Sequence, residues 1–291
     1  MDIRRVKVES VLNKHRKRDS WFLDDYSVNP YYGCSFSCVY CYTRGGKYGR
    51  LPHEIAAKAN APEVLDRQLR RRAQRGEYGF IALGTSTEPY MDVERELKLT
   101  RRILQVISHY RFPVHVLTKS PLVLRDTDLL DEISERAVVP EDLRGKVPGV
   151  IVTFSMSTVD DELAKIFEPG APPPSERLQA LKRLSDRGLR SGVAFIPVLP
   201  FISDDEEELR KGIIAAKESG ASYVFVGALT LPRNVRDSYL KLLSRKFPEA
   251  VPLYAGIFRG DYPTRGYQDR LHRRASRICK EVGIRIGLVG S

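Results

Sequence analysis

Short apolar runs bounded by turn residues alternate with longer amphipathic stretches along most of the chain, and this alternation constrains the fold most. The apolar runs predict six strands, over residues 27–29, 80–83, 114–118, 150–154, 192–198 and 223–228. The amphipathic stretches predict helices over 62–74, 94–109, 122–135, 175–187, from 203 to near 220, 234–247 and 267–282. Repeated strand–helix units predict a parallel sheet in an α/β fold, with right-handed crossovers that place the helices on one side.

The number of strand–helix units predicts the closure of the sheet. Six units favour a partial (β/α)6 barrel of the TIM type over a closed eight-stranded barrel. We expect an N-terminal extension over 1–26, a partial-barrel core over 27–232 and a short C-terminal α/β extension over 233–291 that packs on the core. Reactive groups in such folds sit at the carboxyl ends of the strands, so the motifs after each strand carry the functional prediction.

Three of the four cysteines, Cys34, Cys38 and Cys41, lie within eight residues directly after the first predicted strand. No apolar run approaches the eighteen residues of a membrane span, and no apolar segment follows the charged N-terminus, so we expect a cytoplasmic protein. In a reducing compartment, clustered cysteines bind metal or react more often than they form disulfides. The cluster therefore predicts thiolate ligands.

The spacing C-x3-C-x2-C favours an iron–sulfur cluster, because closely spaced thiolates on one loop can surround a soft metal centre. A structural zinc site is the competing interpretation. Zinc usually takes a closed tetrahedral set from two paired ligand spacings, and no second C-x2-C or H-x3-H pair follows here. The missing fourth ligand is informative, since a [4Fe–4S] cluster held by three thiolates leaves one iron open to a small molecule.

This loop, with Tyr40 before its last cysteine, resembles the defining loop of the radical S-adenosylmethionine enzymes. The resemblance implies that the open iron chelates the amino and carboxylate groups of S-adenosylmethionine. It implies reductive cleavage to methionine and a 5′-deoxyadenosyl radical, which abstracts hydrogen from a substrate. It also implies an external one-electron reductant, such as a flavodoxin- or ferredoxin-like protein.

The segment "GTSTEPY" follows the second predicted strand, where the family carries a Gly-Gly-Glu-Pro-like element that holds the methionine amino group. Ser86 and Thr87 stand in place of the two glycines, and Glu88 is retained. The resemblance makes these three residues candidates for binding S-adenosylmethionine, with backbone carbonyls or hydroxyls sharing the ammonium contact. The alternative for Glu88 is an exposed carboxylate in a turn.

Polar residues also follow the third and fourth predicted strands. Lys119 is the candidate for the methionine carboxylate, because an ammonium group is a compact point charge. Ser155 and Ser157 are candidates for carboxylate or ribose contacts, although serines at strand ends are often only turn formers. The candidates for an adenine site are Tyr40 and the apolar strand ends at 195–197 and 227–228, whose alternative role is simple core packing.

The segments "SVLNKH", "GTSTEPY", "LTKSPLVLRD" and "FEPGAPPPSERLQAL" resemble the spore photoproduct lyase-like (SplB-type) branch, over about residues 10 to 265. Spore photoproduct lyase repairs a thymine dimer in DNA and uses a cysteine near the second strand as hydrogen donor. This chain has no cysteine between Cys41 and Cys279, so that donor does not carry over. The catalytic residue stays unassigned, with Tyr90 and Cys279 as weak candidates; a lone helical cysteine is usually a small buried hydrophobe.

The net charge of +11 makes a nucleic acid a candidate substrate, although basic residues are more often solvated helix faces. The densest basic groups are Arg67, Arg70, Arg71, Arg72 and Arg75, and Arg270, Arg273, Arg274, Arg277 and Lys280. Two other classes compete with a radical enzyme. An iron–sulfur protein for electron transfer or sensing needs neither Glu88 nor Lys119, and a zinc-stabilised nucleic-acid binding module is the third interpretation.

Overall fold

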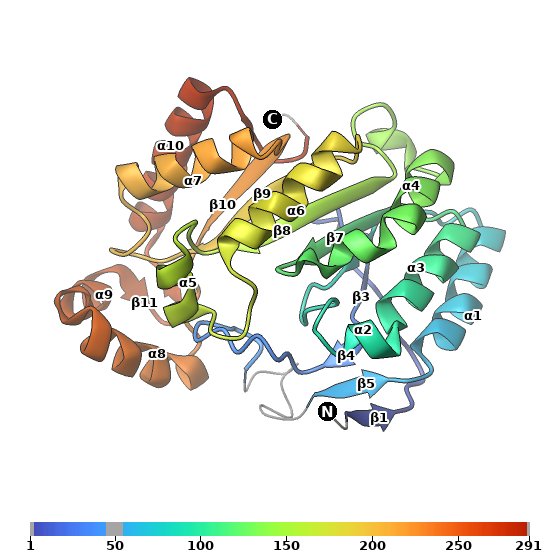
Figure 1. Ribbon diagram of the computed structural model, residues 1–291, viewed down its shortest axis with the longest axis horizontal. Helices are drawn as coiled ribbons and strands as arrows, with labels where there is room; N and C mark the ends of the chain where they lie inside the picture. Colours follow the sequence, from blue (N-terminus) through green and yellow to red (C-terminus); the bar gives the residue numbers. More distant parts are fainter. Residues whose placement is uncertain (1–2, 45–54, 290–291) are drawn as a thin grey trace.

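The computed structural model describes residues 3–44 and 55–289. Its centre is an eight-stranded sheet in the order β13-β10-β9-β8-β7-β6-β3-β2 (Figure 1). The strands are β2 (Leu12–Lys14), β3 (Tyr26–Val28), β6 (Ile81–Leu83), β7 (Val114–Thr118), β8 (Val150–Met156), β9 (Ser191–Val198), β10 (Tyr223–Ala228) and β13 (Arg285–Ile286). All neighbours are parallel except β2, which is antiparallel to β3. The six predicted strands and the open α/β sheet are confirmed.

Ten α-helices lie within the described residues, and Figure 1 shows several of them covering one face of the sheet. They are α1 (Ala61–Gln74), α2 (Glu94–Leu97), α3 (Leu99–His109), α4 (Thr127–Arg136), α5 (Asp161–Phe167), α6 (Pro174–Asp186), α7 (Glu206–Glu218), α8 (Arg233–Lys246), α9 (Val251–Ile257) and α10 (Arg265–Val282). Three 3-10 turns accompany them: η1 (Pro121–Asp126), η2 (Glu141–Leu143) and η3 (Pro248–Ala250).

Two expected helices differ in detail. The helix expected over 94–109 is divided into α2 and α3, because Lys98 adopts a left-handed conformation with φ of 49°. The helix expected over 122–135 begins as the 3-10 turn η1 and becomes α4 only at Thr127. Helix α7 is capped by Asp205, whose carboxylate accepts a hydrogen bond from Glu208 N at 2.9 Å. Helices α5 and α9 were not predicted.

Strands outside the six predicted units connect the chain ends to the core. Strand β1 (Arg4–Val6) pairs with β5 (Ala56–Lys58), which also pairs with β4 (Tyr31–Tyr32), and β4 leads into the cysteine loop. Strands β11 (Phe258–Arg259) and β12 (Tyr262–Pro263) form a separate hairpin. Because β2 and β13 pair with the central sheet, both expected extensions contribute strands to it. The three-part division of the chain itself stays a prediction.

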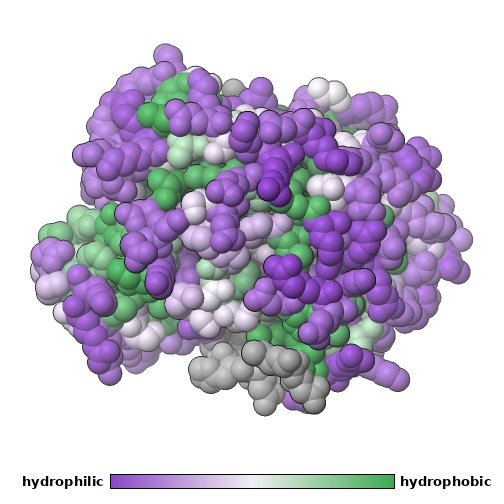
Figure 2. All heavy atoms as spheres, viewed as in Figure 1, coloured by the Kyte–Doolittle hydropathy of each residue, from purple (hydrophilic) through white to green (hydrophobic). Residues whose placement is uncertain are grey.

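The central sheet has a buried cluster on each face, because successive strand residues point to opposite sides. The larger cluster lies between sheet and helices, and the smaller one includes Ile151, Tyr223 and Phe225. Leu23 and the partly buried Phe22, from the N-terminal segment, belong to the smaller cluster. Figure 2 shows mainly hydrophilic residues on the outer face of the helices. No helix among the described residues is long and apolar enough to cross a membrane.

Candidate active site

A cavity of about 390 Å³ opens at the carboxyl ends of the parallel strands. Strands β3, β6, β7, β8, β9 and β10 of the central sheet contribute to it, either directly or through the segment that follows each strand. Its walls are Cys34, Phe36, Cys38, Tyr40, Cys41, Tyr42, Thr43, Gly84, Thr85, Ser86, Thr87, Glu88, Leu117, Thr118, Lys119, Ser155, Ile196, Pro197, Ala228, Leu229 and Thr230. The three clustered cysteines and six of the seven predicted cofactor-binding residues therefore share one cavity, and only Ser157 is absent from its walls.

The cysteine loop is fixed by the segment around α5, beside which it runs in Figure 1. Val39 N donates to Phe167 O at 2.9 Å, and Gly170 N donates to Phe36 O at 3.0 Å. A side chain at Gly170 would place its Cβ 2.5 Å from Ser35 O, so the close approach of the two segments requires glycine. The loop thus has a defined backbone path against α5.

The three clustered thiols differ in exposure but face the same space. Cys38 is buried, and Cys34 and Cys41 are partly buried. Burial, together with the Glu88 carboxylate, raises the pKa of Cys34 to about 11. Burial and the negative charge of Glu168 also raise the pKa of Cys38. The surroundings of Cys34 and Cys38 therefore favour the protonated thiol as long as no cation offsets the thiolate charge.

This donor set suits an iron–sulfur cluster, since three soft sulfur ligands line one wall of a space large enough for a further small molecule. Bound iron would supply the positive charge that offsets the burial of the thiolates. Within residues 3–44 and 55–289, no three His, Cys, Asp or Glu side chains are gathered closely enough to hold a single metal ion.

The Glu88 carboxylate is held from three sides and is 7% exposed. Its Oε1 accepts from Tyr90 N at 2.9 Å and from Thr118 Oγ1 at 2.5 Å, and its Oε2 accepts from Lys119 N at 2.8 Å. Burial raises the pKa of Glu88, while these hydrogen bonds act in the opposite direction. An ionised carboxylate offers about four acceptor positions, so one remains for a cation in the cavity.

Asn29, at the end of β3, shapes the loop that carries Ser86 and Thr87. Its Oδ1 accepts from Ser86 N at 2.9 Å and from Thr87 N at 3.3 Å, and its Nδ2 donates to Thr85 Oγ1 at 3.1 Å. Tyr42, which is exposed at the cavity, donates to Thr85 O at 2.6 Å. Asn29, which precedes the cysteine loop, and Tyr42, which follows its last cysteine, therefore both hold the loop after β6 in place.

A buried charge network forms another wall. Lys119 Nζ donates to Ser155 Oγ at 2.6 Å and lies 3.5 Å from Glu168 Oε1. Glu168 also pairs with Arg177 at 2.6 Å and accepts a hydrogen bond from Tyr40 OH. Arg177 is fully buried and donates from Nη1 to Ser155 O at 2.9 Å. The network joins the cysteine loop, β8 and α6 around one carboxylate.

Three predicted residues lie outside this cavity. Ser157 lines a separate small cavity with Ser203 and Leu209, and its carbonyl accepts from Ser203 Oγ at 2.9 Å. Tyr90 is fully buried beside the Arg125 guanidinium, 6.0 Å from its ring centre. Cys279 is buried on α10 and does not line the cavity. Of the expected adenine wall, Ile196, Pro197 and Ala228 line the cavity, whereas Phe195 and Gly227 do not.

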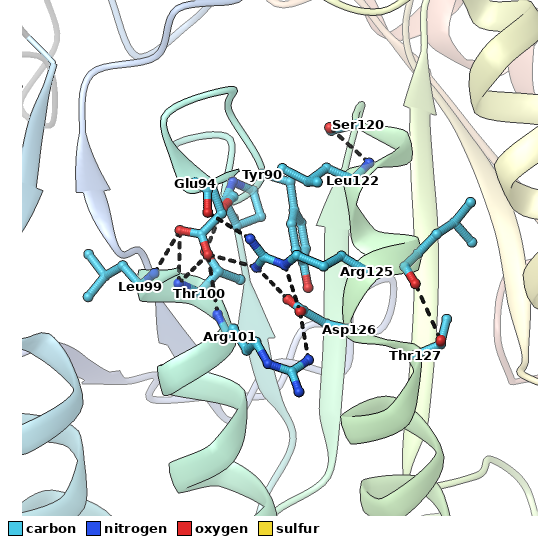
Figure 3. A network of polar contacts seen from close by, with 12 residues as sticks. Tyr90, Glu94, Leu99, Thr100, Arg101, Ser120, Leu122, Arg125, Asp126 and Thr127 are labelled. Atoms are coloured by element: carbon cyan, nitrogen blue, oxygen red, sulfur yellow. Dashed lines mark hydrogen bonds and ion pairs between the residues drawn. The ribbon is translucent and has the colours of Figure 1, made fainter. Parts of the chain in front are cut away.

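Figure 3 shows the network of polar contacts beside Tyr90, in which Glu94, Arg125 and Asp126 take part. Glu94, fully buried, accepts from Leu99 N at 2.9 Å and from Thr100 N at 3.0 Å, and pairs with Arg125 at 2.8 Å. Its carboxylate also accepts a hydrogen bond from Tyr31 OH, just before the cysteine loop. The network therefore ties the base of the cysteine loop to η1 and α3.

The two basic groups lie on outer helices and are partly paired. On α1, Arg70 pairs with Asp66 at 2.9 Å and Arg72 pairs with Glu77. On α10, Arg277 pairs with Glu206 at 2.7 Å. Neither group contributes a residue to the cavity walls.

Sequence reasoning missed several residues that build the site: Asn29, Tyr42, Thr118, Glu168 and Arg177. Asn29 and Thr118 stand at strand ends, which is the signal that identified Glu88 and Lys119. Glu168 and Arg177 lie in the quoted segment "FEPGAPPPSERLQAL", but Glu168 follows helix α5 and Arg177 lies on α6, so neither follows a strand. Their contact across the loop depends on the tertiary fold.

Comparisons with known proteins identify the family of the chain. The family model described as the radical SAM superfamily matches residues 28–213. An uncharacterized protein of Mycobacterium tuberculosis (strain H37Rv) is 32% identical over 259 residues, covering 86% of this chain and 72% of that protein. An uncharacterized protein of Methanocaldococcus jannaschii is 30% identical over 185 residues, covering 62% of this chain and 63% of that protein.

Solved structures share the fold. A spore photoproduct lyase variant with bound AdoMet and dinucleoside spore photoproduct matches with a TM-score of 0.65 at 16% identity, over 94% of this chain and 80% of that chain. SuiB of Streptococcus suis bound to S-adenosylmethionine matches with a TM-score of 0.58 at 12% identity, over 91% of this chain and 50% of that chain. With the family model spanning more than half of its residues, the chain belongs to the radical SAM superfamily of enzymes.

Proposed function

We propose that this enzyme binds a [4Fe–4S] cluster through Cys34, Cys38 and Cys41 and cleaves S-adenosylmethionine reductively. The observation that carries the proposal is that three thiols, a carboxylate and an ammonium group line one cavity. An electron carrier without S-adenosylmethionine would require only the thiols. Glu88 and Lys119, at the ends of neighbouring strands, supply the two charges that a bound amino acid group needs.

Glu88 would receive the methionine ammonium at its remaining acceptor position. Lys119 would receive the methionine carboxylate. Ser155 already accepts a hydrogen bond from Lys119 and would keep the Lys119 ammonium group directed toward the cavity. Ser86 and Thr87 lie beside Glu88 on the same wall. The cluster and S-adenosylmethionine together supply a 5′-deoxyadenosyl radical, and the protein's residues bind and orient the cosubstrate.

The substrate of this radical is proposed to be a nucleic acid, as in DNA repair or nucleic-acid modification. The net charge of +11 supports this choice, as does the shared fold with a lyase whose structure holds a dinucleoside lesion. A flavodoxin- or ferredoxin-like protein is the proposed source of the electron. The cytoplasmic location stays a prediction.

The test is anaerobic reconstitution of the full chain with iron and sulfide, followed by reduction with dithionite in the presence of S-adenosylmethionine. Wild type is expected to bind about four irons and to form 5′-deoxyadenosine. Cys38→Ala is expected to lose both, whereas Cys279→Ala, altered outside the cavity, keeps both. Absence of 5′-deoxyadenosine from the reduced, iron-loaded wild type would overturn the proposal.

A further inference from the structure

The N-terminal segment places an exposed tryptophan against β10, close to the cavity. Trp21 is the chain's single tryptophan and is 38% exposed. Its indole ring stacks on Phe225 of β10, with ring centres 5.6 Å apart and planes only 4° from parallel. Phe225 is almost fully buried, so it covers one side of the indole while part of the ring system stays open to solvent.

Trp21 borders a cavity residue directly. A Cβ placed on Gly227 would lie 3.1 Å from Ile196 Cγ1 and 3.2 Å from Trp21 Cζ3, so the indole and Ile196 meet over this glycine. A larger residue at Gly227 would displace one of them. Ile196 is also a wall of the 390 Å³ cavity, next to Ala228. The indole therefore lies next to a residue of the cavity wall, although Trp21 does not line the cavity itself.

The backbone holds Trp21 in a fixed turn. Asp19 Oδ1 accepts from Trp21 N at 2.8 Å and from Phe22 N at 2.9 Å, and Leu23 N donates to Asp19 O at 2.9 Å. Phe22 O lies 2.8 Å from Nδ1 of the buried His115. Because these contacts order the turn, a ligand that stacks on the indole pays little to immobilise it.

We propose that Trp21 is a stacking platform for a nucleobase-like planar heterocycle bound beside the cavity. This inference rests on the proposed function, which supplies two sources for such a ring: the adenine of S-adenosylmethionine and a base of the nucleic-acid substrate. An indole that stacks on one aromatic ring and is still 38% exposed suits both, since every base has a π-face.

The experiment uses the intrinsic fluorescence of Trp21 in the anaerobically reconstituted full chain. The titrants are S-adenosylmethionine, the dinucleotide thymidylyl-thymidine, and methionine as a control without a ring. At least one ring-bearing titrant is expected to change the emission saturably, and methionine is expected not to. A response to S-adenosylmethionine assigns the cosubstrate's adenine to the platform, and a response to the dinucleotide assigns a substrate base.

Variants separate stacking from packing. Trp21→Leu, which keeps an apolar side chain against Phe225, is expected to weaken binding of the responding titrant about tenfold or more in equilibrium dialysis. Trp21→Phe is expected to restore most of the affinity, and Tyr110→Phe, on the outer helix layer, is expected to change nothing. If Trp21→Leu unfolds at a lower temperature, the wild-type emission and the Trp21→Phe affinity still decide the matter.

The proposal is overturned if no ring-bearing titrant changes the emission more than methionine does, or if a folded Trp21→Leu binds both as tightly as wild type. Failure of the proposed function has a separate signature. It appears as absence of 5′-deoxyadenosine from the reduced wild type, whatever the emission of Trp21 does.

Discussion

Lys119 Nζ lies 3.5 Å from Glu168 Oε1, so the candidate carboxylate-binding ammonium group is paired with a fully buried carboxylate. Burial by itself disfavours the charged form of Glu168, but Lys119 and Arg177 lower the pKa of this carboxyl to about 2. The same carboxylate accepts a hydrogen bond from Tyr40 of the cysteine loop. One ionised side chain thus orients residues on two walls of the cavity.

Glu168→Gln is expected to lower the free energy of unfolding by about 3 kcal/mol, because it leaves the buried Arg177 guanidinium without its anion. Urea unfolding of the apo-protein measures this change. Asp131→Asn, which removes the partner of the exposed Arg187, is the matched control and should cost less than about 1 kcal/mol. Equal effects of the two substitutions would contradict the role of Glu168.

Lys119→Met is expected to weaken S-adenosylmethionine binding by about tenfold or more, because it removes the proposed charge-assisted contact to the methionine carboxylate. Binding of 5′-deoxyadenosine, which lacks that carboxylate, should change little. Equilibrium dialysis with both ligands measures the two affinities on reconstituted protein. A parallel loss for both ligands would show that Lys119 shapes the cavity in general and does not recognise the carboxylate.

Glu88→Gln keeps the size of the side chain but removes the charge that we propose binds the methionine ammonium. It also places an amide N–H opposite one of the three groups from which the Glu88 carboxylate now accepts a hydrogen bond. We expect weaker S-adenosylmethionine binding together with lower thermal stability. Thr118→Val, which removes one of those donors and leaves the carboxylate, should retain more of the affinity; the reverse order would argue against a direct contact to Glu88.

His115 predicts a pH dependence of stability. Burial lowers its pKa to about 4, against an unfolded value of about 6.5. Between these values the unfolded chain binds a proton that the native protein does not, so stability falls as the pH falls through this window. The loss amounts to about 2 kcal/mol between pH 7 and pH 5.

Urea unfolding of wild type and His115→Gln at both pH values isolates this contribution, because other groups titrate equally in the two proteins. The variant should lose less stability than wild type between pH 7 and pH 5. His272→Gln, at an exposed position on α10, should behave like wild type. The same pH dependence in all three proteins would be inconsistent with a buried neutral His115.

The strands of the core were predictable because each is a short apolar run between turn residues. The spacing of apolar residues alone could not show that Lys98 adopts a left-handed backbone conformation and divides the helix into α2 and α3, because lysine is an ordinary helix former. A two-residue strand such as β13, formed by Arg285 and Ile286, is too short to show a periodic pattern, and it is defined by its pairing with β10. Short edge strands of this kind form through tertiary contacts.

The candidate site was predictable where its residues follow strands, as Glu88 and Lys119 do. Glu168 was not, because its function depends on Lys119 and Arg177, which the fold brings together from β7 and α6. Ser157 shows the converse, since the same strand-end rule selected it although its side chain lies beside another cavity. Position after a strand predicts the edge of the sheet but does not predict which way a side chain faces.

The central claim is that three thiolates leave one iron of the cluster open to S-adenosylmethionine. Electron paramagnetic resonance of the reduced, reconstituted protein, recorded before and after adding S-adenosylmethionine, tests this claim most directly. A ligand on the open iron changes that iron's electronic environment. The account therefore predicts that S-adenosylmethionine shifts the cluster signal of wild type, and that methionine alone in the same buffer shifts it less. A cluster signal that S-adenosylmethionine leaves unchanged at saturating concentration would contradict the account.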